Sequence, residues 1–180
     1  RGSNGVTEYG GTSGSANTSV GYYAGNYNLG SHNTKIGKEA GRYATGSYNT
    51  FMGSEAGKGG TTSAPFSSGQ LNTALGYQAL KNFTTAIENT AVGHTSMVGI
   101  TTGGYNTAVG IQSLYRNQTG TGNVAIGKGA MEGVPSNSHS SNTAVGFEAL
   151  KLITTAAGNT ALGYQAGDSI TTSGYNALVG

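Results

Sequence analysis

The chain has no cysteine and no tryptophan, and its only prolines are Pro65 and Pro135. Without cysteine it can form no thiolate metal site. Charged residues make up only 9% of the chain, well below the usual quarter, which argues against a charge-driven disordered tail. Glycine is abundant, with 33 copies among 180 residues, but the scarcity of proline and the lack of a three-residue period exclude collagen.

Long hydrophobic runs and basic patches are also missing. No run of 18 apolar residues occurs, so no membrane-spanning helix is expected. The net charge is only +2, and the basic residues are scattered about one per repeat, which gives no patch for nucleic acid. We find no signal-peptide pattern and interpret the sequence as a window from a longer repetitive protein.

What the chain does contain is a repeat of the form Asn-Thr-Ala-aliphatic-Gly, in which Met52 takes the aliphatic place once. Ten asparagines open the copies: Asn17, Asn33, Asn49, Asn72, Asn89, Asn106, Asn123, Asn142, Asn159 and Asn176. A glycine follows each of them four residues later: Gly21, Gly37, Gly53, Gly76, Gly93, Gly110, Gly127, Gly146, Gly163 and Gly180. A short fixed period of this kind predicts one coil of a solenoid per repeat.

Each copy reads as a short strand. Alternation places the threonine and the aliphatic residue on one face, and asparagine, alanine and glycine on the other. We expect the aliphatic face to form the core and the small-residue face to accept another backbone at close range. Stacking coils at about 4.8 Å would bring the asparagine amides into a hydrogen-bonded ladder and give a rod on the order of 45 Å long.

The segment after each glycine has a second pattern. In Tyr77–Lys81 an aromatic residue and a leucine lie three residues apart, and Glu148 and Lys151 have the same spacing. This spacing is that of a single helical turn. A second short strand, as in a two-walled β-roll, is the alternative, and the sequence does not separate the two.

Two coils carry extra residues, near 61–69 and 134–141, and each insertion contains one proline. Insertions in solenoids form surface loops and often lie on the binding face. We therefore take Phe66, Ser67, Asn137 and His139 as candidate receptor contacts, and we expect a change at His139 to leave stability unaltered.

No catalytic or metal-binding constellation is expected. The only aspartate is Asp168, and His32, His94 and His139 occupy different phases of the repeat. Glu39 and Glu55 share a phase in adjacent coils, but neighbouring basic residues indicate a solvated, neutralised face rather than a glycosidase pair. We predict no enzyme activity, no cofactor and no metal.

The repeat resembles a known family. Asn106–Gly110 and Asn142–Gly146 are similar to the signature of trimeric autotransporter adhesin heads of the YadA-like type, which form a left-handed parallel β-roll. Asn72–Leu80 also resembles repeats of phage tail fibres of the endosialidase-chaperone type. The resemblance implies a homotrimeric, extracellular rod with receptor contacts on its side or tip. The coils here are longer, mostly 16 or 17 residues rather than about 14.

We therefore predict a β-rich solenoid, a parallel β-roll or β-helix of stacked coils, over residues 17–180, preceded by a flank or partial coil at 1–16. The expected function is a structural and adhesive segment of a cell-surface or virion fibre. Its expected partners are copies of itself, as a homotrimer or an end-to-end filament, and a host-cell receptor or glycan. The alternatives are an ice-binding solenoid, disfavoured because the threonine row is expected to share the core face, and a polysaccharide-degrading tailspike segment.

Overall fold

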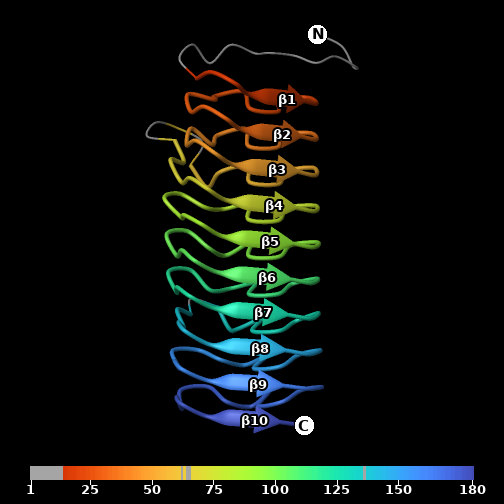
Figure 1. The fold of residues 1–180 in the computed structure, drawn as a ribbon, viewed down its shortest axis with the longest axis vertical. Coiled ribbons are helices and arrows are strands. Elements are labelled where there is room, and N and C mark those ends of the chain that lie inside the picture. Colours follow the sequence, from red (N-terminus) through yellow and green to blue (C-terminus); the bar gives the residue numbers. More distant parts are fainter. Residues whose placement is uncertain (1–13, 62, 64–65, 136) are drawn as a thin grey trace.

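The computed structural model describes residues 14–61, 63, 66–135 and 137–180, and these residues form a parallel β-solenoid without any helix. Each repeat makes one coil, and the coils stack into a straight rod (Figure 1). The ten strands described form a single parallel sheet in which every strand pairs with its neighbours in the sequence. The solenoid predicted from the period is confirmed.

All ten strands are three residues long and occupy the same place in the repeat, directly after its asparagine. They are β1 Thr18–Val20, β2 Thr34–Ile36, β3 Thr50–Met52, β4 Thr73–Leu75, β5 Thr90–Val92, β6 Thr107–Val109, β7 Val124–Ile126, β8 Thr143–Val145, β9 Thr160–Leu162 and β10 Ala177–Val179. The register is continuous, so that Thr73 pairs with Thr90 and Leu75 with Val92. Corresponding residues of successive coils therefore form straight rows along the rod.

The glycine directly after each strand is required by the turn there. Gly76 has φ +133°, a conformation that residues with a side chain rarely adopt. A Cβ at this position would lie 2.6 Å from the carbonyl oxygen of Gly93 in the next coil. The stacked backbones approach too closely here for any other residue, which accounts for the glycine row.

The faces of the strands are the reverse of those expected. The central alanines, such as Ala74 and Ala108, are fully buried, whereas Leu75 and Val109 are 45% and 38% exposed. The aliphatic row therefore does not form the core, and the small-residue face is the interior. The reason is that this wall lies close to the facing wall, whose large side chains already fill the space between them.

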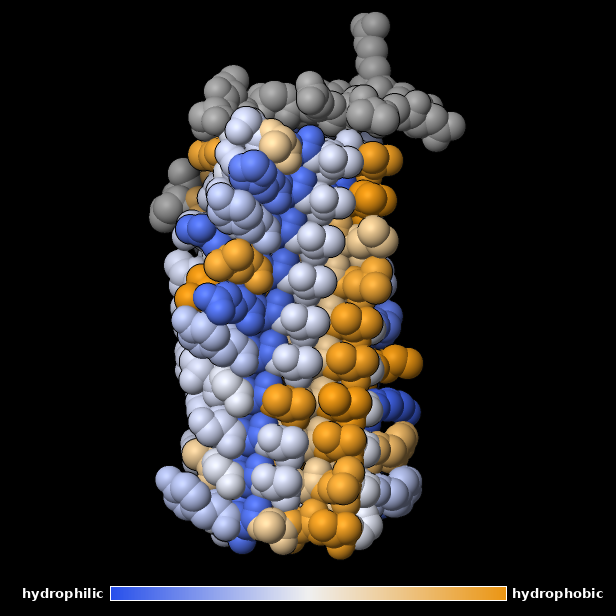
Figure 2. All heavy atoms as spheres, in the orientation of Figure 1, coloured by the Kyte–Doolittle hydropathy of each residue, from blue (hydrophilic) through white to orange (hydrophobic). Residues whose placement is uncertain are grey.

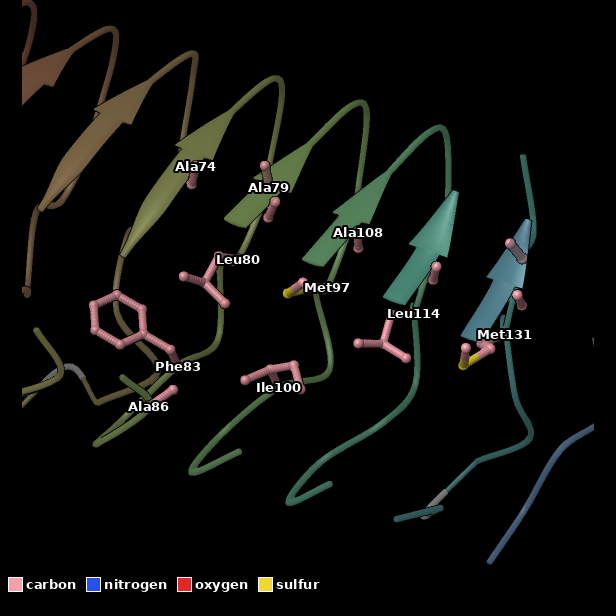
Figure 3. Close-up of a cluster of buried hydrophobic side chains, with 14 of the residues drawn as sticks. Ala74, Ala79, Leu80, Phe83, Ala86, Met97, Ile100, Ala108, Leu114 and Met131 are labelled. Carbon is pink, nitrogen blue, oxygen red and sulfur yellow. The ribbon is translucent and has the colours of Figure 1, made fainter. Parts of the chain in front are cut away.

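The core is built from both walls of the coil. Leu80, Met97, Leu114 and Met131 come from the segment after the strand and are fully buried (Figure 3). They lie opposite the strand alanines in one continuous cluster, which Phe83, Ile100 and Ile153 extend. Small residues on one wall and large residues on the other give a dense interior within a thin coil.

The segment after the glycine is neither a helical turn nor a regular strand. Gln78 and Leu80 have φ values of +55° and +51°, which a right-handed helix does not permit. Their backbone N–H groups donate to Ser54 and Ser96 in the two neighbouring coils. The spacing that suggested a helix thus belongs to a turn whose hydrogen bonds run between coils.

Near the N-terminus the sizes of the facing residues are exchanged. Phe51 occupies the strand position that is Ala74 in the next coil, and Gly57 occupies the position of Leu80. A Cβ on Gly57 would lie 2.4 Å from the Phe51 ring. The ring therefore takes the space that leucine fills elsewhere, and the interior stays filled.

Both expected insertions occur within coils. Ser67 forms an isolated parallel bridge with Ala44, and Asn137 forms one with Asn117, so the coil resumes by these residues. Most of the expected flank at 1–16 lies outside the described residues.

Candidate functional site

The most extensive polar feature is the asparagine row, which lies inside the rod. The backbone N–H of every row asparagine from Asn33 to Asn176 donates to Oδ1 of the preceding one, at 2.8–3.1 Å. In most coils the side-chain Nδ2 also donates to that oxygen. Buried amides are tolerated because each one is paired with its neighbours.

The same side chains also hold the two walls of a coil together. Nδ2 of Asn106 donates to the carbonyl oxygen of Gly120 at 3.0 Å, and Nδ2 of Asn72 donates to that of Ala86 at 2.9 Å. Each asparagine thus connects its strand to the return segment of its own coil and to the adjacent coil. The row is a structural element whose side-chain donors and acceptors are used within the rod, so it is not a ligand site.

A single buried lysine interrupts the apolar interior. Lys35 occupies the central strand position of β2 and is fully buried, and its Nζ donates to Oδ1 of Asn28 at 3.1 Å and to the carbonyl oxygen of Ala44 at 2.8 Å. Burial lowers the pKa of the Lys35 amine to about 7. Gly41 provides the room, since a Cβ there would lie 2.6 Å from Cδ of Lys35.

The outward face of the sheet, which we call the strand face, carries two parallel rows. One row is threonine in eight coils, with Val124 and Ala177 in the others. The second row is the aliphatic one, seen as a hydrophobic stripe along the whole rod in Figure 2. Its exposed members are Val20, Met52, Leu75, Val109, Ile126, Leu162 and Val179. No row residue of the strand face carries a charge.

Aromatic side chains extend this apolar surface at the turn. Tyr22 and Tyr164 follow repeat glycines and are 61% and 67% exposed, so they do not cover the core between coils. Rings in successive coils stack along the rod, with Tyr77 and His94 at 5.4 Å and Phe147 and Tyr164 at 5.3 Å between centroids. The two rows of the strand face are uncharged, whereas the border also contains the exposed lysines Lys38 and Lys128.

The candidate receptor contacts in the insertions are mostly not available to a partner. Ser67, Asn137 and His139 are buried, with 0–2% exposure. Phe66 is half-buried and packs against Tyr27, with the ring centroids 4.6 Å apart. These positions support the coil, and the expectation that they project toward a receptor does not match their burial.

His139 replaces a small residue of the return segment. Like Gly103, Gly120 and Ala156, it lies three residues before a row asparagine. This shared spacing could have identified the position from the sequence. Its carbonyl oxygen accepts from Asn117 and Asn123, while its Nε2 has no partner among the described residues. Burial lowers the pKa of the imidazole to about 4. His139 therefore lies in the interior, and its burial leads us to expect that a change there lowers stability.

The two glutamates that share a phase are paired with basic side chains. Glu39 contacts Lys58 at 2.6 Å and Arg42 at 3.3 Å, and Glu55 contacts Lys81 at 2.6 Å. Hydrogen bonds from Lys58 to Glu39 and from Lys81 to Glu55 lower the pKa of both carboxyl groups. This arrangement ties coils together and keeps both groups ionised, whereas a general acid needs a raised pKa.

Among the described residues, no three side chains of histidine, aspartate or glutamate gather into a possible metal site. The described part of the chain likewise contains no helix that is long and apolar enough to cross a membrane. Comparison with protein-family models, curated proteins and solved structures finds no match to this chain.

Proposed function

We propose that this chain is a structural and adhesive segment of an extracellular fibre, whose copies associate side by side as a homotrimer through the strand face. The observation that carries the proposal is the aliphatic row along the strand face, most of whose members from Val20 to Val179 are exposed. Monomeric proteins rarely leave a continuous apolar patch of this extent open to water. Its burial between copies would supply the driving force for assembly.

The regularity of the strand face favours a second copy as its partner. Side chains recur at about 4.8 Å along the rod, and a partner that interdigitates with them over the whole length must present the same spacing. Another copy of this repeat does so by construction. Because the row residues are uncharged, two such faces meet without like-charge repulsion.

The strand face supplies a large part of an interface. Three residues at about 3.3 Å each make it about 10 Å wide, so over about 45 Å it covers on the order of 450 Å² before the aromatic border is counted. Stable interfaces of standard size bury about 800 Å² on each partner. A trimer would allow each chain to cover this surface around one axis, because closed rotational symmetry leaves no strand face unpaired.

Light scattering on the purified chain tests the proposal. We expect a mass of three times 18.0 kDa for the parent. Val109→Lys should reduce it to the monomer mass, because three ammonium groups would meet at the axis. Leu152→Lys is the matched control, since Leu152 is similarly exposed but lies outside the strands, and it should leave the mass unchanged. A monomeric parent would contradict the proposal.

Ice binding is the second candidate, because the threonine row faces outward rather than toward the core. A flat sheet with regularly spaced threonine and aliphatic rows can order water on its surface, and the objection raised from the sequence no longer applies. The two functions need the same face, so they exclude each other. Thermal hysteresis from a monomeric sample, abolished by Thr107→Lys, would favour ice binding over fibre assembly.

A further inference from the structure

A shallow cavity of about 310 Å³ lies on the side of the rod, lined by Val98, Gly99, Tyr115, Arg116, Gln118 and Pro135. No lining residue belongs to a strand, so the cavity and the proposed self-association use different residues. Three successive coils contribute to it, and Pro135 brings in the second insertion. The insertion thus takes part in a surface feature through this residue, although Asn137 and His139 are buried.

The cavity contains a cation without a counter-charge. In the described part of the chain, the Arg116 guanidinium makes no ion pair, and its contact is with the Tyr115 ring at 5.6 Å from the centroid. Arg42 differs, since its guanidinium contacts Glu39 at 3.3 Å. A half-buried, unneutralised arginine beside a cavity attracts an anionic group, and its planar fork matches a carboxylate.

The remaining lining groups suit a sugar ring. Gln118 is exposed, and within the described ranges its side-chain amide makes no hydrogen bond, so it is free to bind hydroxyl groups. Tyr115 and Pro135 supply apolar surface for the ring carbons. The volume lies at the lower limit for ligand sites, which indicates one sugar unit rather than a larger molecule.

We propose that this cavity binds a single carboxylated sugar unit of a longer glycan, with Arg116 on the carboxylate, Gln118 on hydroxyl groups and Tyr115 against the ring. The proposal rests on the adhesive role proposed above and assigns it a ligand class. The open side of the cavity leaves room for the glycan chain to continue into solvent. Repetition of the site on each copy of an assembled rod would raise the avidity for such a chain.

Titration with glucuronate, followed by calorimetry or by backbone NMR shifts, tests the site. We expect a dissociation constant on the order of 1 mM, with shifts at Tyr115 and Arg116, and at least about tenfold weaker binding of neutral glucose. Arg116→Gln should weaken glucuronate binding about tenfold or more. Lys38→Gln is the matched control, because it removes the same charge from an exposed lysine in a distant coil, and it should bind like the parent.

Equal binding of glucose and glucuronate would overturn the proposal, and so would equal losses in the two variants. Inorganic phosphate that competes as well as glucuronate would show an unspecific anion site and would also overturn it. If the chain forms trimers but does not bind glucuronate, the proposed sugar site is wrong and the proposed fibre assembly is unaffected. If a monomeric chain binds glucuronate, the sugar site is supported and the fibre assembly is wrong.

Discussion

Replacement of Asn106 by alanine tests whether the asparagine ladder stabilises the rod. Asn106 is 1% exposed and lies in β6's coil near the middle of the stack. Its Oδ1 accepts from the backbone N–H of Asn123 at 3.0 Å and from Nδ2 of Asn123 at 2.9 Å. Its own Nδ2 donates to Asn89 at 3.0 Å and to the carbonyl oxygen of Gly120 at 3.0 Å.

The alanine variant leaves two buried groups without partners, the N–H of Asn123 and the carbonyl of Gly120. Each orphaned group costs about 1 to 3 kcal/mol, so the loss is about 4 kcal/mol. This is a large part of the total of about 5 to 15 kcal/mol that a typical domain has. At about 2 to 4 °C per kcal/mol for a chain of this length, the melting temperature should fall by about 8 to 16 °C.

Circular dichroism melts of the parent, Asn106→Ala and Thr121→Ala provide the assay. Thr121 is exposed and its side chain makes no hydrogen bond among the described residues, so its loss should stay within about 0.5 kcal/mol. Amide exchange adds a local readout, because protection of the Asn123 N–H should fall before that of distant coils. If Asn106→Ala melts together with Thr121→Ala, the ladder does not stabilise the stack.

Two further predictions concern the interior. The fold lowers the pKa of Lys35 to about 7, so between about pH 10.5 and pH 7 only the unfolded chain takes up the proton. The free energy of unfolding should therefore fall by about 1.4 kcal/mol for each pH unit as the pH drops through this window. Chemical denaturation should show this slope, and Lys35→Met should remove it. Gly57→Leu should destabilise the rod by about 1 to 3 kcal/mol, because the new side chain meets the Phe51 ring. Phe51→Ala should destabilise it by about 3 to 5 kcal/mol. The double variant should recover most of this stability, because it recreates the alanine and leucine pair of the next coil. Additive losses in this double-mutant cycle would contradict the exchange of sizes between the walls.

The period of the repeat was sufficient to predict the stacked coils, because ten asparagines and ten glycines in fixed relation leave few other folds. It was not sufficient to orient the strands. Alternation separates Thr107 and Val109 from Ala108, but it does not say which face is inside. Hydrophobicity pointed to the valine. The alanine face is the interior, because Asn106 on the same face makes its hydrogen bonds inside the rod. The facing wall also contributes the large side chain of Leu114 to the core.

The prediction that the insertions form surface loops failed at His139 for a related reason. Counting forward from Asn123 places His139 within a run of extra residues, and extra residues suggest a loop. Counting backward from Asn142 places it at a buried position of the return segment, where its carbonyl completes the bond to Asn123. A repeat re-enters its register before the next signature, so the residues just ahead of a signature belong to the coil rather than to the insertion.

The interior ladder also determines what the outside can do. Because the backbone of each coil bonds to the next coil in one register, every outward row inherits the same spacing, whatever its residues are. A surface of this kind recognises partners that have the same period, such as a copy of itself or an ordered lattice of water, and it discriminates poorly among irregular ones. If the chain has the adhesive role proposed above, selective recognition of a ligand would come from places where the repetition is broken, such as the cavity that Pro135 lines together with Tyr115 and Arg116. We expect glucuronate to shift the Arg116 resonances and only substitutions on the strand face to change the oligomer mass. Ligand binding and self-association would then be separate, and loss of either would leave the other intact.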